Sequence, residues 1–163
     1  MEQVLQFLSD LARNNHRDWF KANYSRYSES REKMRLITEI LINEIRKFDP
    51  GIPAMDPKDC MFRIFRDVRF SKDKRPYKTN FGSFIARGGR KSPYAGYYLH
   101  IDPAGSFAGG GIYMPPTATL KAIREQIVRD PDRFLQLTGA PGFKSFFPGM
   151  MDHRLKTAPP GVS

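Results

Sequence analysis

The period of the apolar residues changes at Cys60, and this change constrains the fold more than any other feature of the sequence. Before Cys60, apolar side chains recur at the three-four spacing of one helix face. After it they alternate along the chain, as in strands with one apolar side. A helical pattern returns after Pro116. This order predicts an α+β domain, with N-terminal helices packed on a central, mostly antiparallel sheet, followed by C-terminal helices.

The N-terminal part contains two helical patterns. Residues 3–13 place four apolar side chains on one helix face, namely Val4, Phe7, Leu8 and Leu11. A longer pattern covers residues 17–48, in which Ser25 and Ser28 leave room for a break into two helices. Residues 51–59 contain two prolines and are predicted to form a loop.

The middle of the chain has the twofold period of strands. The segments with this period are residues 61–70, 81–87, 94–102 and 107–114. The connections between them are too short for crossover helices, so we expect an antiparallel sheet. Residues 71–80 contain a proline and alternating charges, which are typical of an exposed loop. Helices are predicted over residues 117–128 and 131–138, and no clear period follows Gly139.

The composition excludes several classes of protein. A chain of 163 residues has room for a single domain, and 40% hydrophobic residues supply enough apolar material for a core. The only cysteine excludes an internal disulfide framework and a cysteine-rich zinc site. No apolar stretch is long enough to span a membrane, and the N-terminus does not resemble a signal peptide. We therefore expect one cytoplasmic domain over residues 1–163 with no membrane partner.

The positive charge is concentrated in one segment. The formal net charge is +10. Residues 1–60 are neutral, whereas residues 61–90 carry nine basic and two acidic side chains, for a net charge of +7. Either the fold supplies acidic groups to this segment, or an anionic ligand does.

The basic segment contains the strongest candidate for a binding site. Arg63, Asp67 and Arg69 share one face of the predicted strand, where guanidinium groups can converge on one planar anion. Arg66 falls on the apolar face, so it is either turned outward by a bulge or placed against a carboxylate. The structural alternative is that these arginines pair with Asp67, Asp73 and acids of the long helix. The functional alternative is a pocket for a phosphate, sulfate or carboxylate group.

A second polar face is predicted on residues 94–102. Tyr98, His100 and Asp102 alternate there with apolar residues. A histidine and a carboxylate on one strand face can act as proton donor and acceptor near neutral pH. A histidine on a sheet also commonly makes a structural hydrogen bond. The three histidines, His16, His100 and His153, have no metal-ligand spacing, so no metal site is predicted.

Four ordered blocks of the sequence resemble a known family. They are FLSDLARNNHRDWF (residues 7–20), RIFRDVRFSKDKRPYKTNFG (63–82), GYYLHIDP (96–103) and GGGIYMPPTATLKAIR (109–124). The chain thereby resembles the bacterial and fungal family called domain of unknown function 2461. The resemblance implies an intracellular α+β protein without a known cofactor. Members usually continue for some tens of residues beyond a motif similar to LKTAPPG (155–161), so the chain is expected to be truncated at its C-terminus.

These observations lead to two hypotheses about function. The first is binding of, or catalysis on, a phosphorylated or other anionic small molecule. Its ligand-binding residues would be Arg63, Arg66, Arg69, Lys74, Lys78 and Tyr98, and its proton-transfer residues His100 and Asp102. The alternative is a nucleic-acid or protein-partner binding module that uses the basic segment, residues 61–90, as an electrostatic surface. If both hypotheses fail, a purely structural role remains.

Overall fold

The computed structural model describes residues 1–147 and divides the chain into two compact units, one over residues 1–114 and one that begins at Pro115. The expected single domain therefore stays a prediction. The predicted family motif at residues 155–161 and the third histidine, His153, lie outside the described residues. Each unit is described by itself below, and the architecture is the predicted α+β type.

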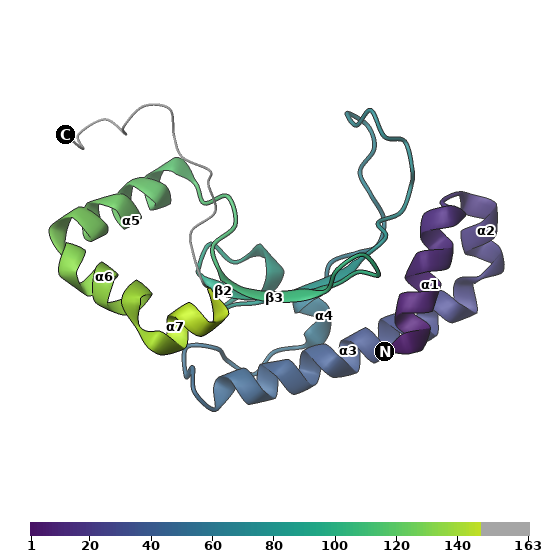
Figure 1. Cartoon of the computed structure of the whole chain (residues 1–163). Coiled ribbons are helices and arrows are strands. Elements are labelled where there is room, and N and C mark those ends of the chain that lie inside the picture. Colours follow the sequence, from purple (N-terminus) through teal and green to yellow (C-terminus); the bar gives the residue numbers. More distant parts are fainter. Residues whose placement is uncertain (148–163) are drawn as a thin grey trace. The chain divides into compact units, whose positions relative to one another are not determined.

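Three helices begin the first unit, and their positions follow the apolar pattern closely. They are α1 (Glu2–Arg13), α2 (Arg17–Ala22) and α3 (Tyr24–Arg46) (Figure 1). The four apolar residues predicted for the first helix face are all fully buried. The long helical pattern is broken as expected, but the break lies at Asn23 and not at a serine.

A short helix, α4 (Pro57–Cys60), corrects the prediction of an unbroken loop over residues 51–59. Asp56 precedes it, and its carboxylate accepts a hydrogen bond from the backbone N–H of Lys58. A proline at the first helical position lacks only an N–H that would have no partner in the helix. Pro57, one of the two prolines that predicted a loop, begins a helix instead.

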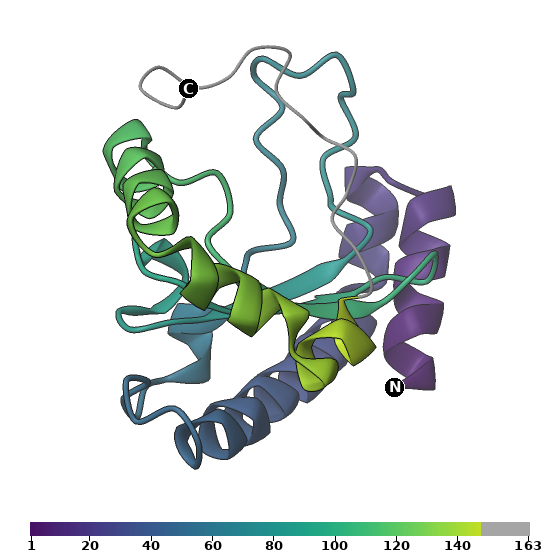
Figure 2. The same ribbon diagram turned by 60° about the vertical axis from the view of Figure 1, so that its left-hand side comes forward.

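The sheet has three antiparallel strands in the order β1-β2-β3. They are β1 (Phe81–Ile85), β2 (Gly96–Ile101) and β3 (Phe107–Gly111), and a short 3-10 helix (Gly89–Lys91) follows β1. Figures 1 and 2 show α3 running along one face of this sheet. The register places Gly82 opposite His100 and Phe84 opposite Tyr98, on the face that points away from the helices.

The predicted strand over residues 61–70 is wrong. Only two isolated bridges form, between Met61 and Ser83 and between Phe65 and Tyr77. Residues 62–80, which we call the arm, project from the sheet as an irregular loop (Figure 1). The alternating pattern misleads because aspartates within the arm accept backbone N–H groups locally, and such bonds compete with a strand ladder. Pro76 also has no N–H to give to a ladder.

A buried hydrogen bond joins α3 to β1. The Thr38 and Ser83 hydroxyl oxygens lie 2.7 Å apart, and both residues are fully buried. Thr38 also donates to the carbonyl oxygen of Met34 at 2.8 Å. The Thr38 proton is thereby committed, so Ser83 is the donor between the two hydroxyls. Around this pair pack the apolar residues of α1, α3 and the inner face of β1.

The second unit contains three helices within its described residues. They are α5 (Thr117–Arg129), α6 (Pro131–Gly139) and α7 (Pro141–Phe146). The first two confirm the predicted helices, and the third was not predicted because the residues after Gly139 have no clear period. Among residues 1–147, no helix is both long and apolar enough to cross a membrane.

The Thr38–Ser83 pair provides a test of how the sheet is attached to the helices. We expect Ser83→Ala and Thr38→Val each to lower the free energy of unfolding by about 1–3 kcal/mol, because Thr38→Val leaves the buried Ser83 hydroxyl without its partner and Ser83→Ala removes one of the two hydrogen bonds of the Thr38 hydroxyl. The double variant should lose less than the sum of the two, since neither polar group then remains. Urea denaturation monitored by circular dichroism measures all four proteins, and strictly additive losses would contradict the coupling.

Candidate functional site

Two arginines of the arm are paired with carboxylates of the arm itself. Arg66 donates to Asp73 at 2.7 Å and to the carbonyl oxygen of Arg75 at 3.2 Å. Arg69 forms a forked pair with Asp67, at 3.0 and 2.7 Å. Arg66 was predicted either to be turned outward by a bulge or to lie against a carboxylate, and in the structure it lies against the carboxylate of Asp73. Arg66 and Arg69 stay predicted ligand-binding residues, but each already has an acidic partner.

Asp73 is the electrostatic centre of the arm. Besides Arg66, its carboxylate accepts from the guanidinium and the backbone N–H of Arg75. These contacts, those of Arg75 first, hold the pKa of Asp73 far below its usual range. Lys74 is directed elsewhere and donates to the carbonyl oxygen of Val68 at 3.0 Å. The acidic groups that neutralise the arm therefore come from the arm, and not from the long helix.

Lys78 has a different environment from the other cations. Its ammonium lies 5.5 Å from the ring centroid of Phe62, and its side chain is partly buried. Burial lowers the pKa of Lys78, and the nearby charge of Arg63 lowers it further. Among residues 1–147, neither Lys78 nor Arg63 has a carboxylate within salt-bridge distance.

Asn15 holds the base of the arm in position. Its side-chain amide donates to the carbonyl oxygen of Tyr77 at 3.0 Å and accepts from the Tyr77 N–H at 3.1 Å. The Tyr77 ring stacks on Phe20, with centroids 4.0 Å apart. Lys78 follows directly and donates its N–H to Ile64 at 2.8 Å. Sequence reasoning missed Asn15, because the Asn pair after the first helix reads only as a helix end.

Tyr98 and His100 lie together on the outer face of β2, as predicted. The Tyr98 hydroxyl is 2.8 Å from Nδ1 of His100. Burial raises the pKa of Tyr98, so the hydroxyl stays protonated and can donate to Nδ1. The amide nitrogen of Asn80 lies 3.4 Å from the same atom and adds a weaker contact. With Nδ1 as acceptor, a neutral His100 carries its proton on Nε2.

Asp102 stands on the other side of the His100 ring. One of its carboxylate oxygens lies 3.7 Å from Nε2, which is longer than a hydrogen bond, and both side chains are 21% exposed. The other oxygen accepts from the backbone N–H of Ala104 at 2.8 Å. The structure therefore brings the two predicted proton-transfer residues together, with Nε2 not yet committed to a partner.

Ring contacts connect the arm with this face of the sheet. Phe62, which lies under Lys78, is 6.3 Å from the ring of Tyr98, and Phe107 of β3 stacks on His100 at 4.8 Å. We call this group the sheet-face cluster. Its members are Phe62, Arg63, Lys78, Asn80, Tyr98, His100, Asp102 and Phe107.

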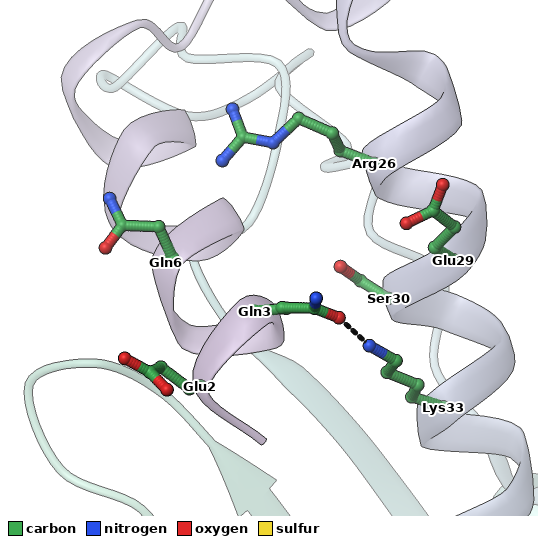
Figure 3. A pocket seen from close by; sticks show the side chains of 7 residues that line it. All are labelled: Glu2, Gln3, Gln6, Arg26, Glu29, Ser30 and Lys33. Atoms are coloured by element: carbon green, nitrogen blue, oxygen red, sulfur yellow. Dashed lines mark hydrogen bonds between the residues drawn. The ribbon is translucent and has the colours of Figure 1, made fainter.

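Two cavities lie elsewhere in the first unit, and no predicted site residue lines either of them. The larger, of about 390 Å³, lies between α1 and α3 (Figure 3). Its lining residues are Glu2, Gln3, Gln6, Arg26, Glu29, Ser30 and Lys33. Arg26 is paired with Asp10 at 2.6 Å, and Lys33 donates to Gln3. The smaller, of about 190 Å³, is next to α4. The larger cavity is lined by two glutamates as well as two cations, and both cations already have polar partners, so it does not favour an anion.

The part of the chain that the structure describes does not favour a metal site or a reactive cysteine. Within residues 1–147, no three or more histidine, cysteine, aspartate or glutamate side chains are grouped as a metal site requires. Cys60 is fully buried, and burial raises the pKa of its thiol to about 11. The thiol is therefore protonated at neutral pH and a poor nucleophile.

The comparison with known families agrees with the resemblance of the four blocks. Residues 3–163 match the family described as Conserved hypothetical protein (DUF2461). The chain belongs to the DUF2461 family. No curated protein and no solved structure matches it. Two of the blocks lie in or beside the sheet-face cluster: the DUF2461 block at residues 63–82 contains Lys78 and Asn80, and the block at 96–103 contains Tyr98, His100 and Asp102.

The ion pairs of Asp73 provide a test of the arm's structure in this DUF2461 protein. We expect Asp73→Asn to loosen the arm, because Arg66 and Arg75 lose their shared partner. Trypsin should then cleave at Lys72 and Lys74 several-fold faster, since a protease needs a mobile segment. Limited proteolysis with mass spectrometry identifies the cleavage sites. Glu29→Gln, which removes an exposed carboxylate of α3, is the control, and an unchanged cleavage rate in Asp73→Asn would overturn this account.

Proposed function

We propose that the chain binds a phosphorylated or other anionic small molecule at the sheet-face cluster, with Lys78 and Arg63 as the cationic groups. The observation that carries the proposal is the environment of Lys78, a partly buried ammonium over the ring of Phe62. Within residues 1–147 no carboxylate pairs with it. A charge that is partly removed from water normally has a partner of opposite sign. An anionic ligand supplies that partner.

Arg63 strengthens the argument, because it adds a second positive charge whose field lowers the pKa of Lys78. Two like charges repel each other more strongly where water is excluded than in bulk water. One phosphate between them offsets this repulsion. The guanidinium can donate two parallel hydrogen bonds, whereas the ammonium acts as a point charge.

His100 gives the site a group for proton transfer. Its Nδ1 accepts a hydrogen bond from Tyr98, which fixes the ring. Its Nε2 makes no hydrogen bond within residues 1–147, since the nearest carboxylate oxygen, of Asp102, is 3.7 Å away. When both ring nitrogens are protonated, Nε2 can give its proton to a bound ligand, and the neutral ring that remains donates its Nδ1 proton to the Tyr98 hydroxyl. The same Nε2 can then take a proton back. The carboxylate of Asp102 stabilises the protonated ring. We propose His100 as the acid or base of the site and Asp102 as the group that supports its charge.

Thermal stabilisation by anions tests the proposal. We expect phosphate or pyrophosphate to raise the melting temperature, because a ligand at about 100 times its Kd adds about 2.7 kcal/mol of stability. Lys78→Met keeps the aliphatic contact with Phe62 but removes the charge, so it should abolish the shift. Arg69→Ala and Lys91→Met are controls, since the first residue is already paired and the second is exposed.

Scanning fluorimetry at constant ionic strength measures these shifts. Absence of a response in the wild type to phosphate, pyrophosphate and sulfate would contradict the proposal. A response that persists in Lys78→Met would do the same. If Arg69→Ala reduced the anion-induced shift in melting temperature as much as Lys78→Met does, the anion would bind at the arginines of the arm instead.

The pKa of Lys78 adds a pH dependence to this test. Because it is lowered in the folded protein, the unfolded chain binds more protons between the folded value and the ordinary value of 10.5. In that range this group makes stability rise with pH, and Lys78→Met should remove the increase. Anion affinity should instead fall with rising pH as the ammonium loses its proton.

A second candidate function is nucleic-acid binding at the tip of the arm. The ring of Phe70 is 97% exposed, and the guanidinium of Arg69 lies 5.9 Å from its centroid. Lys72 and Lys74 follow within four residues. An exposed aromatic ring among cations can stack on a base while the cations contact phosphates. This arrangement favours a single-stranded nucleic acid, because bases in a duplex are already stacked.

Fluorescence anisotropy with a single-stranded oligonucleotide tests the second candidate. Phe70→Ala should weaken binding about tenfold, since stacking of one base contributes about 1–3 kcal/mol. The affinity should fall steeply with salt in both proteins, because the cations are unchanged. Tyr113→Ala is the control, since Tyr113 is 89% exposed but lies outside the arm. A flat salt response, or an equal loss in the control, would remove this candidate.

A further inference from the structure

An exposed aromatic side chain borders the proposed anion site. Phe107 stacks on His100 with an angle of 20° between the rings, and it lies 5.7 Å from the ring of Tyr98. One side of its ring is thus covered by His100, yet the side chain remains 55% exposed. Its uncovered side can stack on a second planar ring. Lys78 is connected to Phe107 through the rings of Phe62 and Tyr98.

The cations and the aromatic ring belong to one continuous surface. Lys78 contacts Phe62, Phe62 contacts Tyr98, and Tyr98 contacts both His100 and Phe107. A molecule that covers Phe107 and also reaches Lys78 therefore passes over Tyr98. It needs a flat apolar part at one end and a negative charge at the other.

We infer that the ligand of the sheet-face cluster is nucleotide-like, with a planar aromatic ring on Phe107 and a phosphate at Lys78 and Arg63. The inference rests on the proposed function for its anionic part and adds the class of the ligand. A sugar phosphate or an inorganic anion would satisfy the cations but would leave Phe107 uncovered. A planar heteroaromatic ring stacks on the exposed side of Phe107 and continues the stack that His100 begins.

The third strand provides a position for testing where the ring lies. Gly109 is the register partner of Tyr98, so a side chain added there would stand on the outer face next to Tyr98. A Cβ at Gly109 would meet no heavy atom within 4 Å, so a larger residue is accommodated without a clash. Gly110 is paired with Tyr97 and points to the opposite face, which makes it a matched control.

Isothermal titration calorimetry with four probes tests the inference. The probes are adenosine 5′-monophosphate, uridine 5′-monophosphate, ribose 5-phosphate and inorganic phosphate. We expect the two nucleotides to bind the wild type about tenfold or more tightly than ribose 5-phosphate, because only they stack. Phe107→Ala and Gly109→Val should reduce nucleotide affinity to that of ribose 5-phosphate. Both should leave the affinity for inorganic phosphate unchanged, and Gly110→Val should bind all four probes as the wild type does.

The results separate failure of this inference from failure of the proposed function. Equal affinities for nucleotides and ribose 5-phosphate, with inorganic phosphate still bound through Lys78, would overturn the nucleotide class and leave the anion site intact. Nucleotide binding that survives both Phe107→Ala and Gly109→Val would also overturn the inference. If no probe binds the wild type, the proposed function fails and the inference fails with it. Two independent variants are used so that misfolding of one does not decide the result.

Discussion

The hydrogen bond between Thr38 and Ser83 determines which face of the sheet carries the site. Ser83 lies in the middle of β1 and points into the core, where its hydroxyl meets that of Thr38 on α3. Side chains alternate along a strand, so Gly82 points to the opposite face. His100 of β2 pairs with Gly82, so it lies on the same outer face of the sheet. A shift of one residue in the pairing of β1 with β2 would place His100 on the same face as Ser83, in the core. The core contact and the site are thus two consequences of one register.

The arm, whose seven basic and two acidic side chains give a net charge of +5, shows how a basic segment is accommodated without a large opposing surface. Asp67 and Asp73 neutralise arginines within a few residues of themselves. Arg90 instead donates to two backbone carbonyl groups at the end of α4. Such pairs are exposed, so each adds little to stability, but together they fix the directions of the arginine side chains. Beside the sheet, Lys78 and Arg63 are the cations that have no carboxylate partner within the described residues. The unpaired positive charge there is therefore localised and much smaller than the sequence indicates.

Sequence reasoning predicted the parts of the fold in which apolar residues repeat regularly. The helix over residues 3–13 and the strands β1 and β2 follow from such patterns, because burial of one face decides both the period and the structure. The part of the arm over residues 62–70 was wrongly predicted as a strand, since its alternation arises from paired charges and not from burial, whereas residues 71–80 were predicted as a loop and have no strand. Asn15 was missed because its partner, Tyr77, is 62 residues away, and an asparagine at a helix end has no sequence signature for such a contact. Tyr98, His100 and Asp102 were placed together correctly because Tyr98 and His100 lie on β2 and Asp102 directly follows its last residue.

The contact between Gly82 and Tyr98 links the fold to the chemistry of His100. A Cβ at residue 82 would stand 2.9 Å from the Tyr98 hydroxyl oxygen and 3.3 Å from its ring, so any larger residue would displace that side chain. Only with glycine there can the hydroxyl lie beside Nδ1 of His100 and donate to it. That bond fixes the tautomer and leaves the Nε2 proton facing Asp102 at 3.7 Å. Gly82 therefore affects His100 through Tyr98. It leaves room for the Tyr98 hydroxyl to hold Nδ1, while Nε2 remains available to a ligand.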